Sequence, residues 1–276
     1  MQFLTLSDLE TQSINPDSFI EGDCLKVMPF IKEKSIDLIL ADLPFGTTKA
    51  AWDKQIDPIQ LWEQYKRIIK PNGAILLFAQ TPFDKVLGCS NLPWLRYEWI
   101  WEKTQASGYF NAKKMPMKSH ENILVFYNNL PTYNPQKTTG HKPVNSYTKK
   151  AEVCNKTEVY GKVKKDISGG GDTDRYPRSI LKFKSDKQIN KSNGFMHSAQ
   201  KPLALIEYFI KTYTNPGDLV LDNVAGSATV GIAAQNLGRD FILIENDEKS
   251  IEISKKRLAQ NSFVTSSLDF SYNTEK

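Results

Sequence analysis

A carboxylate, a backbone carbonyl and an aromatic ring follow one another at the end of a short apolar run. The run, residues 36–41, contains one polar residue and is typical of a buried strand in a parallel sheet. A proline three residues after the end of the run stops the strand, because it cannot donate to the ladder. Ligands of open α/β sheets bind at this edge, so we interpret the turn as a candidate catalytic site, with a plain strand-ending turn as the alternative. The candidate catalytic residues are Asp42, Leu43, Pro44 and Phe45.

The same four residues resemble the Asp-Pro-Pro-Tyr/Phe tetrapeptide of amino-group DNA methyltransferases. The resemblance implies that the Asp42 carboxylate and the Leu43 carbonyl accept hydrogen bonds from an exocyclic amine, favouring a pyramidal nitrogen as the methyl group arrives. It also implies that Phe45 stacks on a base flipped out of the DNA helix. Leu43 replaces the usual first proline, and Phe45 replaces the commoner tyrosine.

A second motif follows an apolar run ending in Asp222, and it consists of small residues that open a helix. Gly226 allows close approach of a ligand, and hydroxyl groups near a helix N-terminus suit a carboxylate. The stretch resembles the Asp-Pro-Phe-x-Gly-Ser-Gly-Thr-Thr motif for S-adenosylmethionine. Ala228 replaces a glycine, and its methyl group could crowd the methionine end of the cofactor. The resemblance assigns cofactor contacts to Asp222, Val224, Ala225, Gly226, Ser227 and Thr229.

Further residues join the expected cofactor site. Glu245 ends the next predicted strand 23 residues after Asp222, a distance that suits a ligand of the ribose diol. Asp23 is assigned by resemblance to the adenine end, with a helix N-cap as the alternative. Residues 196–203 resemble the His-Pro-Thr-Gln-Lys-Pro segment that precedes the cofactor strand. That segment adds His197, Gln200 and Lys201, and Asp42 borders the same site.

The composition limits the class of protein. A chain of 276 residues with 40% apolar residues and 14 Phe can form one large α/β domain, with or without an insert. Its 3 cysteines form no Cys-x-x-Cys pair, so neither zinc nor a disulfide framework is expected, and a reducing cytoplasm is the natural setting. We expect no signal peptide, no transmembrane span and no membrane partner. Transfer to an amine beside a carboxylate needs no metal.

Positive charge is concentrated in residues 131–192, where 12 Lys and 2 Arg stand against 6 acids. This segment carries +8, whereas the whole chain carries only +5. Aromatic residues among the lysines suit contact with nucleic acid, although a solvated loop is the alternative. The resemblance places the target-recognition region here, with Arg175 and Arg178 as guanine readers or phosphate contacts.

The segment before the basic region also resembles the family. A Trp-Glu-Lys sequence precedes a Lys-x-His-Glu run that, by this resemblance, introduces a strand of the target-base wall. The resemblance assigns DNA contacts to Lys113, Lys114 and His120. His120 alone would suit a catalytic base or a metal ligand, but the reaction requires neither.

The spacing of apolar residues predicts the elements that position these motifs. We expect helices over 58–69, 84–88, 203–210 and 249–258, and a further helix opening at the cofactor loop. We expect strands over 74–79, 97–103, 219–222 and 240–245, a turn at 71–73, a long irregular connection over 128–194 and a frayed tail from 261.

The order of motifs resembles the β group of amino methyltransferases, with the catalytic turn first and the cofactor loop last. The expected fold is a Rossmann-like, doubly wound, mostly parallel sheet in circularly permuted order. Residues 1–130 form the catalytic half, 131–192 the recognition region and 193–276 the cofactor half. The expected activity is S-adenosylmethionine-dependent methylation of adenine N6 in double-stranded DNA.

Several alternatives remain open at this point. Cytosine N4 is the other amino target, and RNA is another substrate of the same class. A DNA-binding module that lost catalysis would suit Leu43 and Ala228. A nicotinamide-dependent oxidoreductase would use Asp222 and Glu245 but leaves the catalytic turn unexplained. A homodimer and a partner restriction endonuclease are compatible with the family, and these residues decide neither.

Overall fold

The computed structural model describes residues 1–47, 53–154, 165–184 and 200–271, which fall into two compact units. The larger unit comprises Met1–Asn134 with Ser179–Lys276, and the smaller unit comprises Pro135–Arg178. Within the described residues, none of the helices is both long enough and apolar enough to cross a membrane.

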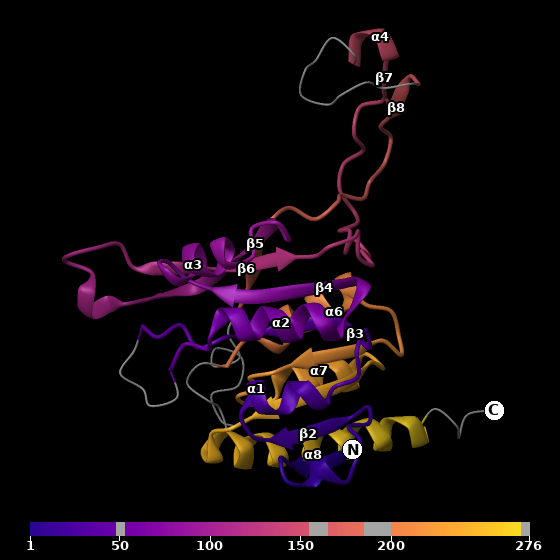
Figure 1. Ribbon diagram of the computed structural model, residues 1–276. Helices are drawn as coiled ribbons and strands as arrows, with labels where there is room; N and C mark the ends of the chain where they lie inside the picture. Colours follow the sequence, from indigo (N-terminus) through magenta and orange to yellow (C-terminus); the bar gives the residue numbers. More distant parts are fainter. Residues whose placement is uncertain (48–52, 155–164, 185–199, 272–276) are drawn as a thin grey trace. The chain divides into compact units, whose positions relative to one another are not determined.

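A nine-stranded sheet forms the centre of the larger unit (Figure 1). Its order is β1-β2-β11-β10-β3-β4-β6-β5-β9, and only β6 runs antiparallel to its two neighbours. The expectation of a doubly wound, mostly parallel sheet is therefore confirmed. The strands are β1 (Gln2–Thr5), β2 (Ser18–Glu21), β3 (Ile36–Ala41), β4 (Ile69–Ala79), β5 (Leu95–Ser107), β6 (Lys118–Phe126), β9 (Ile180–Phe183), β10 (Leu219–Asp222) and β11 (Asp240–Glu245).

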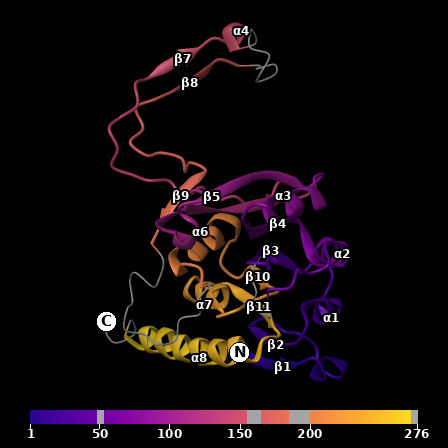
Figure 2. The same ribbon diagram turned by 90° about the vertical axis from the view of Figure 1, so that its left-hand side faces the viewer.

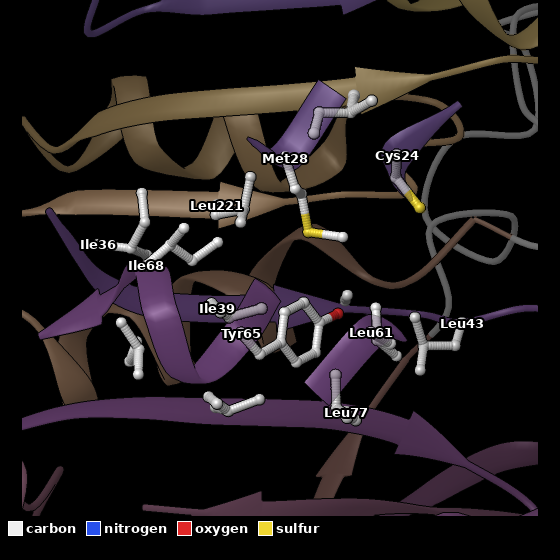
Figure 3. Packing of buried hydrophobic residues seen from close by; sticks show 14 of the residues in the cluster. Cys24, Met28, Ile36, Ile39, Leu43, Leu61, Tyr65, Ile68, Leu77 and Leu221 are labelled. Atoms are coloured by element: carbon white, nitrogen blue, oxygen red, sulfur yellow. The ribbon is translucent and has the colours of Figure 1, made fainter. Parts of the chain in front are cut away.

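Helices cover both faces of this sheet, with α1 and α2 on one side and α6 and α7 on the other (Figure 2). Each face buries its own apolar cluster, and Figure 3 shows part of the first, where Met28, Tyr65, Ile39 and Leu221 pack together. The helices are η1 (Asp8–Glu10), α1 (Cys24–Val27), η2 (Met28–Phe30), α2 (Pro58–Ile68), α3 (Phe83–Ser90), η3 (Tyr109–Asn111), α6 (Leu203–Tyr213), α7 (Thr229–Asn236) and α8 (Glu248–Ser271).

Local sequence explains where two of these helices begin. Pro58 is the first residue of α2, where its missing N–H is tolerated, and Asp57 accepts a hydrogen bond from the Ile59 N–H at 3.0 Å. Asp247 accepts from the Ser250 N–H at 2.9 Å and so caps the start of α8. The apolar face of α2 then packs against β3 and β4, as its helical spacing predicts.

The structure differs from expectation at residues 71–73, which belong to β4 rather than to a turn. The pairing of β3 with β4 jumps from Ile36–Ile69 to Leu38–Ala74. The extra residues of β4 are therefore accommodated as a bulge, a feature that a Pro-Asn-Gly sequence permits without reversing the chain.

Two further expectations about irregular segments are wrong. Residues 180–183 of the expected long connection form β9, which pairs with β5 and extends the main sheet. The last helix, α8, continues through the expected frayed tail as far as Ser271. β9 has only four residues, so its apolar spacing alone is a weak signal.

The smaller unit contains a two-stranded antiparallel pair and one short helix. Its elements are β7 (Tyr147–Lys149), α4 (Ala151–Cys154) and β8 (Ile167–Gly169). An isolated bridge between Thr138 and Arg175 also joins its two ends. The described residues of this unit therefore resemble a long hairpin.

Candidate active site

The carboxyl ends of the neighbouring strands β10 and β3 open onto a cavity of about 550 Å³. The chain leaves the two strands toward opposite sides of the sheet, which is where open α/β sheets bind ligands. His197 lies outside the described residues, but the other expected cofactor residues line this cavity. They are Asp23, Asp42, Gln200, Lys201, Asp222, Val224, Ala225, Gly226, Ser227, Thr229 and Glu245.

The loop between β10 and α7 forms one wall of the cavity. Gly226 and Ala228 both have left-handed backbone conformations, with φ of 52° and 58°. The Ala228 side chain is fully buried among apolar residues and does not line the cavity. The expected crowding of the cofactor by this methyl group is therefore wrong, because the left-handed turn directs it into the core.

Residues of β11 and α8 hold this loop in place. The Glu245 Oε2 accepts a hydrogen bond from the Gly226 N–H at 2.7 Å, and the Ser254 hydroxyl donates to the Gly226 carbonyl at 2.6 Å. Arg257 donates to the Ser227 carbonyl and to the Thr229 hydroxyl. Sequence reasoning missed Ser254 and Arg257, although their spacing of three residues places them on one helical face.

Glu245 has a second structural role. Its Oε1 accepts from the N–H groups of Asn246 and Asp247, each at 2.8 Å. The carboxylate thus fixes both the cofactor loop and the start of α8, while remaining at the cavity wall. Its expected role as ribose ligand stays a prediction.

Asp23 caps a helix, which was the alternative to its expected contact with the cofactor. It is the N-cap of α1, and its Oδ1 accepts from the Leu25 N–H at 2.8 Å. It also lines the cavity, so capping and ligand contact are compatible in this place.

A buried polar contact lies between the cavity and the core. The Tyr65 hydroxyl donates to Asn223 Oδ1 at 2.6 Å. Burial raises the pKa of the neighbouring Cys24 thiol to about 11, although Asn223 opposes the shift by hydrogen bonding to the sulfur. Tyr65 therefore fixes Asn223 at the cavity wall.

Asp222 is the deepest carboxyl group of the cavity. Burial raises its pKa to about 8, the Val224 N–H opposes this by a hydrogen bond, and Glu245 adds to it by repulsion. At neutral pH the group is therefore mostly protonated. A cationic ligand beside it would favour the ionised form.

Four charged side chains alternate in sign beside the catalytic turn. The Lys201 ammonium lies 2.7 Å from Asp42 Oδ2 and 3.0 Å from Glu121 Oε2. The Lys103 ammonium lies 2.6 Å from Glu121 Oε1. Among the described residues, Asp42 Oδ1 is buried and has no hydrogen-bond partner. Sequence reasoning missed Glu121 and Lys103 as members of this group.

The surroundings of these groups shift their pKa values in different directions. Burial raises the pKa of Asp42, Lys201 lowers it and Glu121 raises it again, so that the net shift is upward. Burial also acts to raise the pKa of Glu121, but Lys201 and Lys103 outweigh it and the net shift is downward. The pKa of Lys201 is raised, because its two carboxylate partners outweigh the desolvation that lowers it.

The remaining residues of the catalytic turn are fixed by packing and hydrogen bonds. Leu43 belongs to the buried core beside α2 (Figure 3). The half-buried ring of Phe45 stacks on Phe83 with centroids 5.2 Å apart. The Phe45 carbonyl accepts from Gln55 at 2.8 Å, and Asp53 accepts from the Gly46 N–H at 2.7 Å. The turn is thus held from both sides.

The residues expected to contact DNA fall in both units. Lys113, Lys114 and His120 are exposed on the β5–β6 hairpin of the larger unit. In the smaller unit, the Arg175 guanidinium already donates to the carbonyls of Lys142, Asp172 and Asp174. Arg178 is exposed. These contacts favour a structural role for Arg175, because its donors would have to leave three carbonyls to read a guanine.

The charge of the cavity distinguishes between the two ligands that the sequence left open, S-adenosylmethionine and a nicotinamide dinucleotide. Six carboxyl side chains and two lysines line it, and the acids are Asp23, Asp42, Asp57, Asp222, Glu245 and Asp247. Such a wall repels the pyrophosphate of a dinucleotide and suits a ligand with positive charge. In the part of the chain that the structure describes, no three His, Cys, Asp or Glu side chains are placed to hold a metal ion together.

Comparison with known proteins agrees with this geometry. A family model described as DNA methylase, of the N6/N4 methyltransferase type, matches residues 36–256. The type II methyltransferase M.HinfI of Haemophilus influenzae is 28% identical over 88% of this chain and 68% of its own length. The DNA adenine methyltransferase YhdJ of Escherichia coli is 29% identical over 87% of this chain and 82% of its own length.

Solved structures share the fold. The cytosine-N4-specific PvuII DNA methyltransferase has a TM-score of 0.62 at 17% identity, over 88% of this chain and 86% of its own. The M1.HpyAVI–SAM complex has a TM-score of 0.58 at 21% identity, over 87% of this chain and 98% of its own. Because the family match spans most of the chain, this protein belongs to the N6/N4 DNA methylase family.

Proposed function

We propose that this protein transfers the methyl group of S-adenosylmethionine to the exocyclic N6 amine of an adenine in duplex DNA. The observation that carries the proposal is the placement of Asp42 at the wall of the same cavity as the 222–229 loop. A methyl donor bound in the cavity would then lie close to an amine that is hydrogen-bonded to Asp42, at the carboxyl end of β3.

The residues of the cavity fit S-adenosylmethionine. Its sulfonium and ammonium groups are positive, and the cavity wall is rich in carboxyl groups. Asn223 lies at the same wall, and the left-handed turn at Gly226 brings backbone close to a ligand. When bound, this cofactor supplies an electrophilic methyl group. The solved structure of M1.HpyAVI is a complex with this cofactor.

Asp42 and its neighbours have the chemistry to activate an amine. A hydrogen bond from the amine to Asp42 leaves more of the nitrogen lone pair available for attack. The Leu43 carbonyl is a second acceptor, and the Phe45 ring offers a face for a flipped base. Placement in a dry, prearranged site supplies most of the rate enhancement in such a reaction.

Adenine is favoured over cytosine by the first residue of the turn. Asp42 starts the tetrapeptide, which leans toward adenine N6, and the relative YhdJ is named as an adenine enzyme. Cytosine N4 is the second candidate, because the PvuII enzyme shares the fold. The exposed lysines of the β5–β6 hairpin and the basic residues 131–192 are our proposed DNA contacts, with the latter as the recognition region.

The test is methyl transfer from labelled S-adenosylmethionine to mixed-sequence duplex DNA, followed by digestion to nucleosides. We expect label in N6-methyladenine for the wild type and none for Asp42→Ala. Glu63→Ala is a control, because Glu63 is an exposed acid on α2 that does not line the cavity. Label in N4-methylcytosine would overturn the base assignment, and label in both Asp42→Ala and the wild type would overturn the role of Asp42.

Binding of the cofactor is measured separately by calorimetry. If S-adenosylmethionine binds but no DNA is labelled, the proposed DNA substrate is wrong and RNA is tested in its place. If the cofactor does not bind, the assignment of the cavity is wrong.

A further inference from the structure

Three strands and the segment before α6 bring four charges into one row at the carboxyl edge of the sheet. Asp42 follows β3, Glu121 lies on β6 and Lys103 lies on β5. Lys201, just before α6, places its ammonium 5.1 Å from the centre of the Phe78 ring on β4, between the two acids. The row therefore reads negative, positive, negative, positive across the sheet order β3-β4-β6-β5.

Glu121 differs from Asp42 in how its oxygens are used. Both oxygens of Glu121 are within ion-pair distance of an ammonium, at 2.6 Å for Lys103 and 3.0 Å for Lys201, although Oε2 makes no hydrogen bond among the described residues. Asp42 has one oxygen on Lys201 and one buried oxygen without a hydrogen bond among the described residues. A buried carboxylate oxygen with neither an ion pair nor a hydrogen bond destabilises a fold, so the persistence of Asp42 Oδ1 in this state points to a ligand.

Glu121 also limits how Lys201 can bind Asp42. The ammonium lies between two carboxylates, one just after β3 and one on β6, so both carboxylates determine its position. Lys103, held against the Trp101 ring at 5.3 Å, in turn fixes Glu121. All four side chains are at most 29% exposed, which limits screening by water.

We propose that Glu121 and Lys103 are positioning residues that hold the Lys201 ammonium on one oxygen of Asp42 and leave the other to the substrate amine. The proposal rests on the proposed function, since it concerns the acceptor in that reaction. Neither Glu121 nor Lys103 touches the amine in this scheme, and neither lines the cavity.

The charges that face Asp42 predict how each variant shifts its titration. Lys201 and Lys103 lower the pKa of Asp42, and Glu121 raises it. Asp222, on β10, is the other titratable neighbour and is mostly protonated at neutral pH. Removing the charge of Glu121 should therefore lower the pKa of Asp42, and removing that of Lys103 should raise it.

A merely structural role predicts a different result. If Glu121→Gln and Lys103→Gln only loosen the site, water enters in both variants and the pKa of Asp42 moves toward its ordinary value in both. Shifts of opposite sign separate the two explanations. The double variant removes one negative and one positive charge, so it should bring the pKa of Asp42 back toward that of the wild type.

The experiment measures the pKa of Asp42 by carboxyl carbon NMR in the full chain, with Asp42→Asn used to assign the signal. The variants are Glu121→Gln, Lys103→Gln and the double variant. Opposite shifts with recovery in the double variant support the proposal. Shifts in the same direction, or no shift, would overturn it. This readout needs no methyl transfer, so it stands apart from the test of function.

The rate of methyl transfer provides the second readout. We expect Glu121→Gln to lower kcat by about 100-fold, the loss typical of a misplaced reacting group, with the KM for DNA changed less than about threefold. A rise in KM with an unchanged kcat contradicts the proposal. If Glu121→Gln does not fold, Glu121→Asp replaces it. This variant keeps the charge but shortens the side chain, so kcat should fall while the pKa of Asp42 stays near that of the wild type.

Discussion

The ammonium of Lys201 and the carboxylate of Asp42 form a 2.7 Å ion pair that joins the two halves of the chain. Asp42 belongs to the half that carries the catalytic turn, and Lys201 precedes the helix that leads to the cofactor loop. Neither half contains a complete site alone. The catalytic and cofactor motifs, which are far apart in the circularly permuted sequence, are therefore linked in the structure by this ion pair.

Replacing Lys201 by Met should shift the pH dependence of methyl transfer. Burial and Glu121 both raise the pKa of Asp42, and Lys201 opposes them. Without the ammonium, Asp42 stays protonated to a higher pH, so the acid limb of the rate profile should move upward. Lys201→Arg keeps the charge and should leave the limb near its original place. The profile is measured as kcat/KM against pH, and an unmoved limb in Lys201→Met contradicts the prediction.

Asp222 should make the protein less stable as pH rises. The pKa of Asp222 is about 8 in the folded chain, whereas the ordinary value of 3.8 applies to the unfolded chain. As pH rises, the unfolded chain therefore releases this proton at a lower pH than the folded chain. The free energy of unfolding is highest below the ordinary value and falls until pH passes about 8.

Asp222→Asn should remove this dependence while keeping the acceptor for the Val224 N–H. The gain in stability over the wild type should grow from about pH 4 to pH 8, with each pKa unit contributing about 1.4 kcal/mol. Urea unfolding at both ends of this range measures it. A gain that is constant over the range would show that Asp222 is ionised in the folded protein.

The hydrogen bond from Tyr65 to Asn223 should affect both stability and cofactor binding. Tyr65→Phe leaves Asn223 Oδ1 unsatisfied in a buried place, so we expect a loss of about 1–3 kcal/mol. S-adenosylmethionine should also bind more weakly by calorimetry, since Asn223 lines the cavity.

Tyr213→Phe is the matched control for this variant. The Tyr213 hydroxyl accepts from the Trp99 indole at 2.7 Å, in the core on the other face of the sheet. A similar loss of stability is expected there, with unchanged affinity for the cofactor. Equal weakening of cofactor binding in both variants would assign the effect to general loosening.

The sequence predicted the strands and helices that carry strong apolar spacing, and it placed most cavity residues in one site. It did so because a buried parallel strand and a glycine-containing turn are local signals. Glu121 and Lys103 lie in motifs that the sequence shows, but their ion pair could not be predicted, since it depends on the order of strands β4, β6 and β5. The bulge at 71–73 and the pairing of β9 were likewise set by neighbouring strands.

Ala228 shows the same limit at a single residue. The motif that it resembles has glycine there, and the structure gives a physical reason in the left-handed φ of 58°. The sequence alone placed the methyl group against the ligand, whereas the turn directs it into the core. The direction of a Cβ in a left-handed turn depends on the surrounding fold and cannot be read from the motif.

Ala228 also allows a direct test of backbone strain. The left-handed conformation disfavours alanine by about 1–2 kcal/mol, while glycine loses a buried methyl group worth about 0.8 kcal/mol and gains backbone entropy on unfolding. These effects oppose each other, so Ala228→Gly should stay within about 1 kcal/mol of the wild type. Ala228→Val should lose at least about 2 kcal/mol, because a branched side chain tolerates this conformation poorly. Urea unfolding of both variants checks it, and a stable valine variant would contradict the strain.

The exposed lysines of the β5–β6 hairpin should act on DNA binding through phosphate charge alone. The hairpin leaves the sheet at the carboxyl end of β5, and residues 104–118 contain three lysines and no acid. Lys113→Gln with Lys114→Gln should weaken binding to mixed-sequence duplex DNA. The slope of log affinity against log salt should become shallower by up to about 1.8, or about 0.9 for each phosphate that a lysine no longer neutralises.

Lys32→Gln with Lys211→Gln is the control that separates this local effect from net charge. It also removes two positive charges, but at exposed positions near the amino ends of the parallel strands, where no site is expected. Its salt slope should match that of the wild type. Equal slopes for the two double variants would mean that the protein attracts DNA by overall charge, and the hairpin would then lose its assigned role. A smaller slope in the hairpin variant alone would place the phosphate backbone beside Lys113 and Lys114.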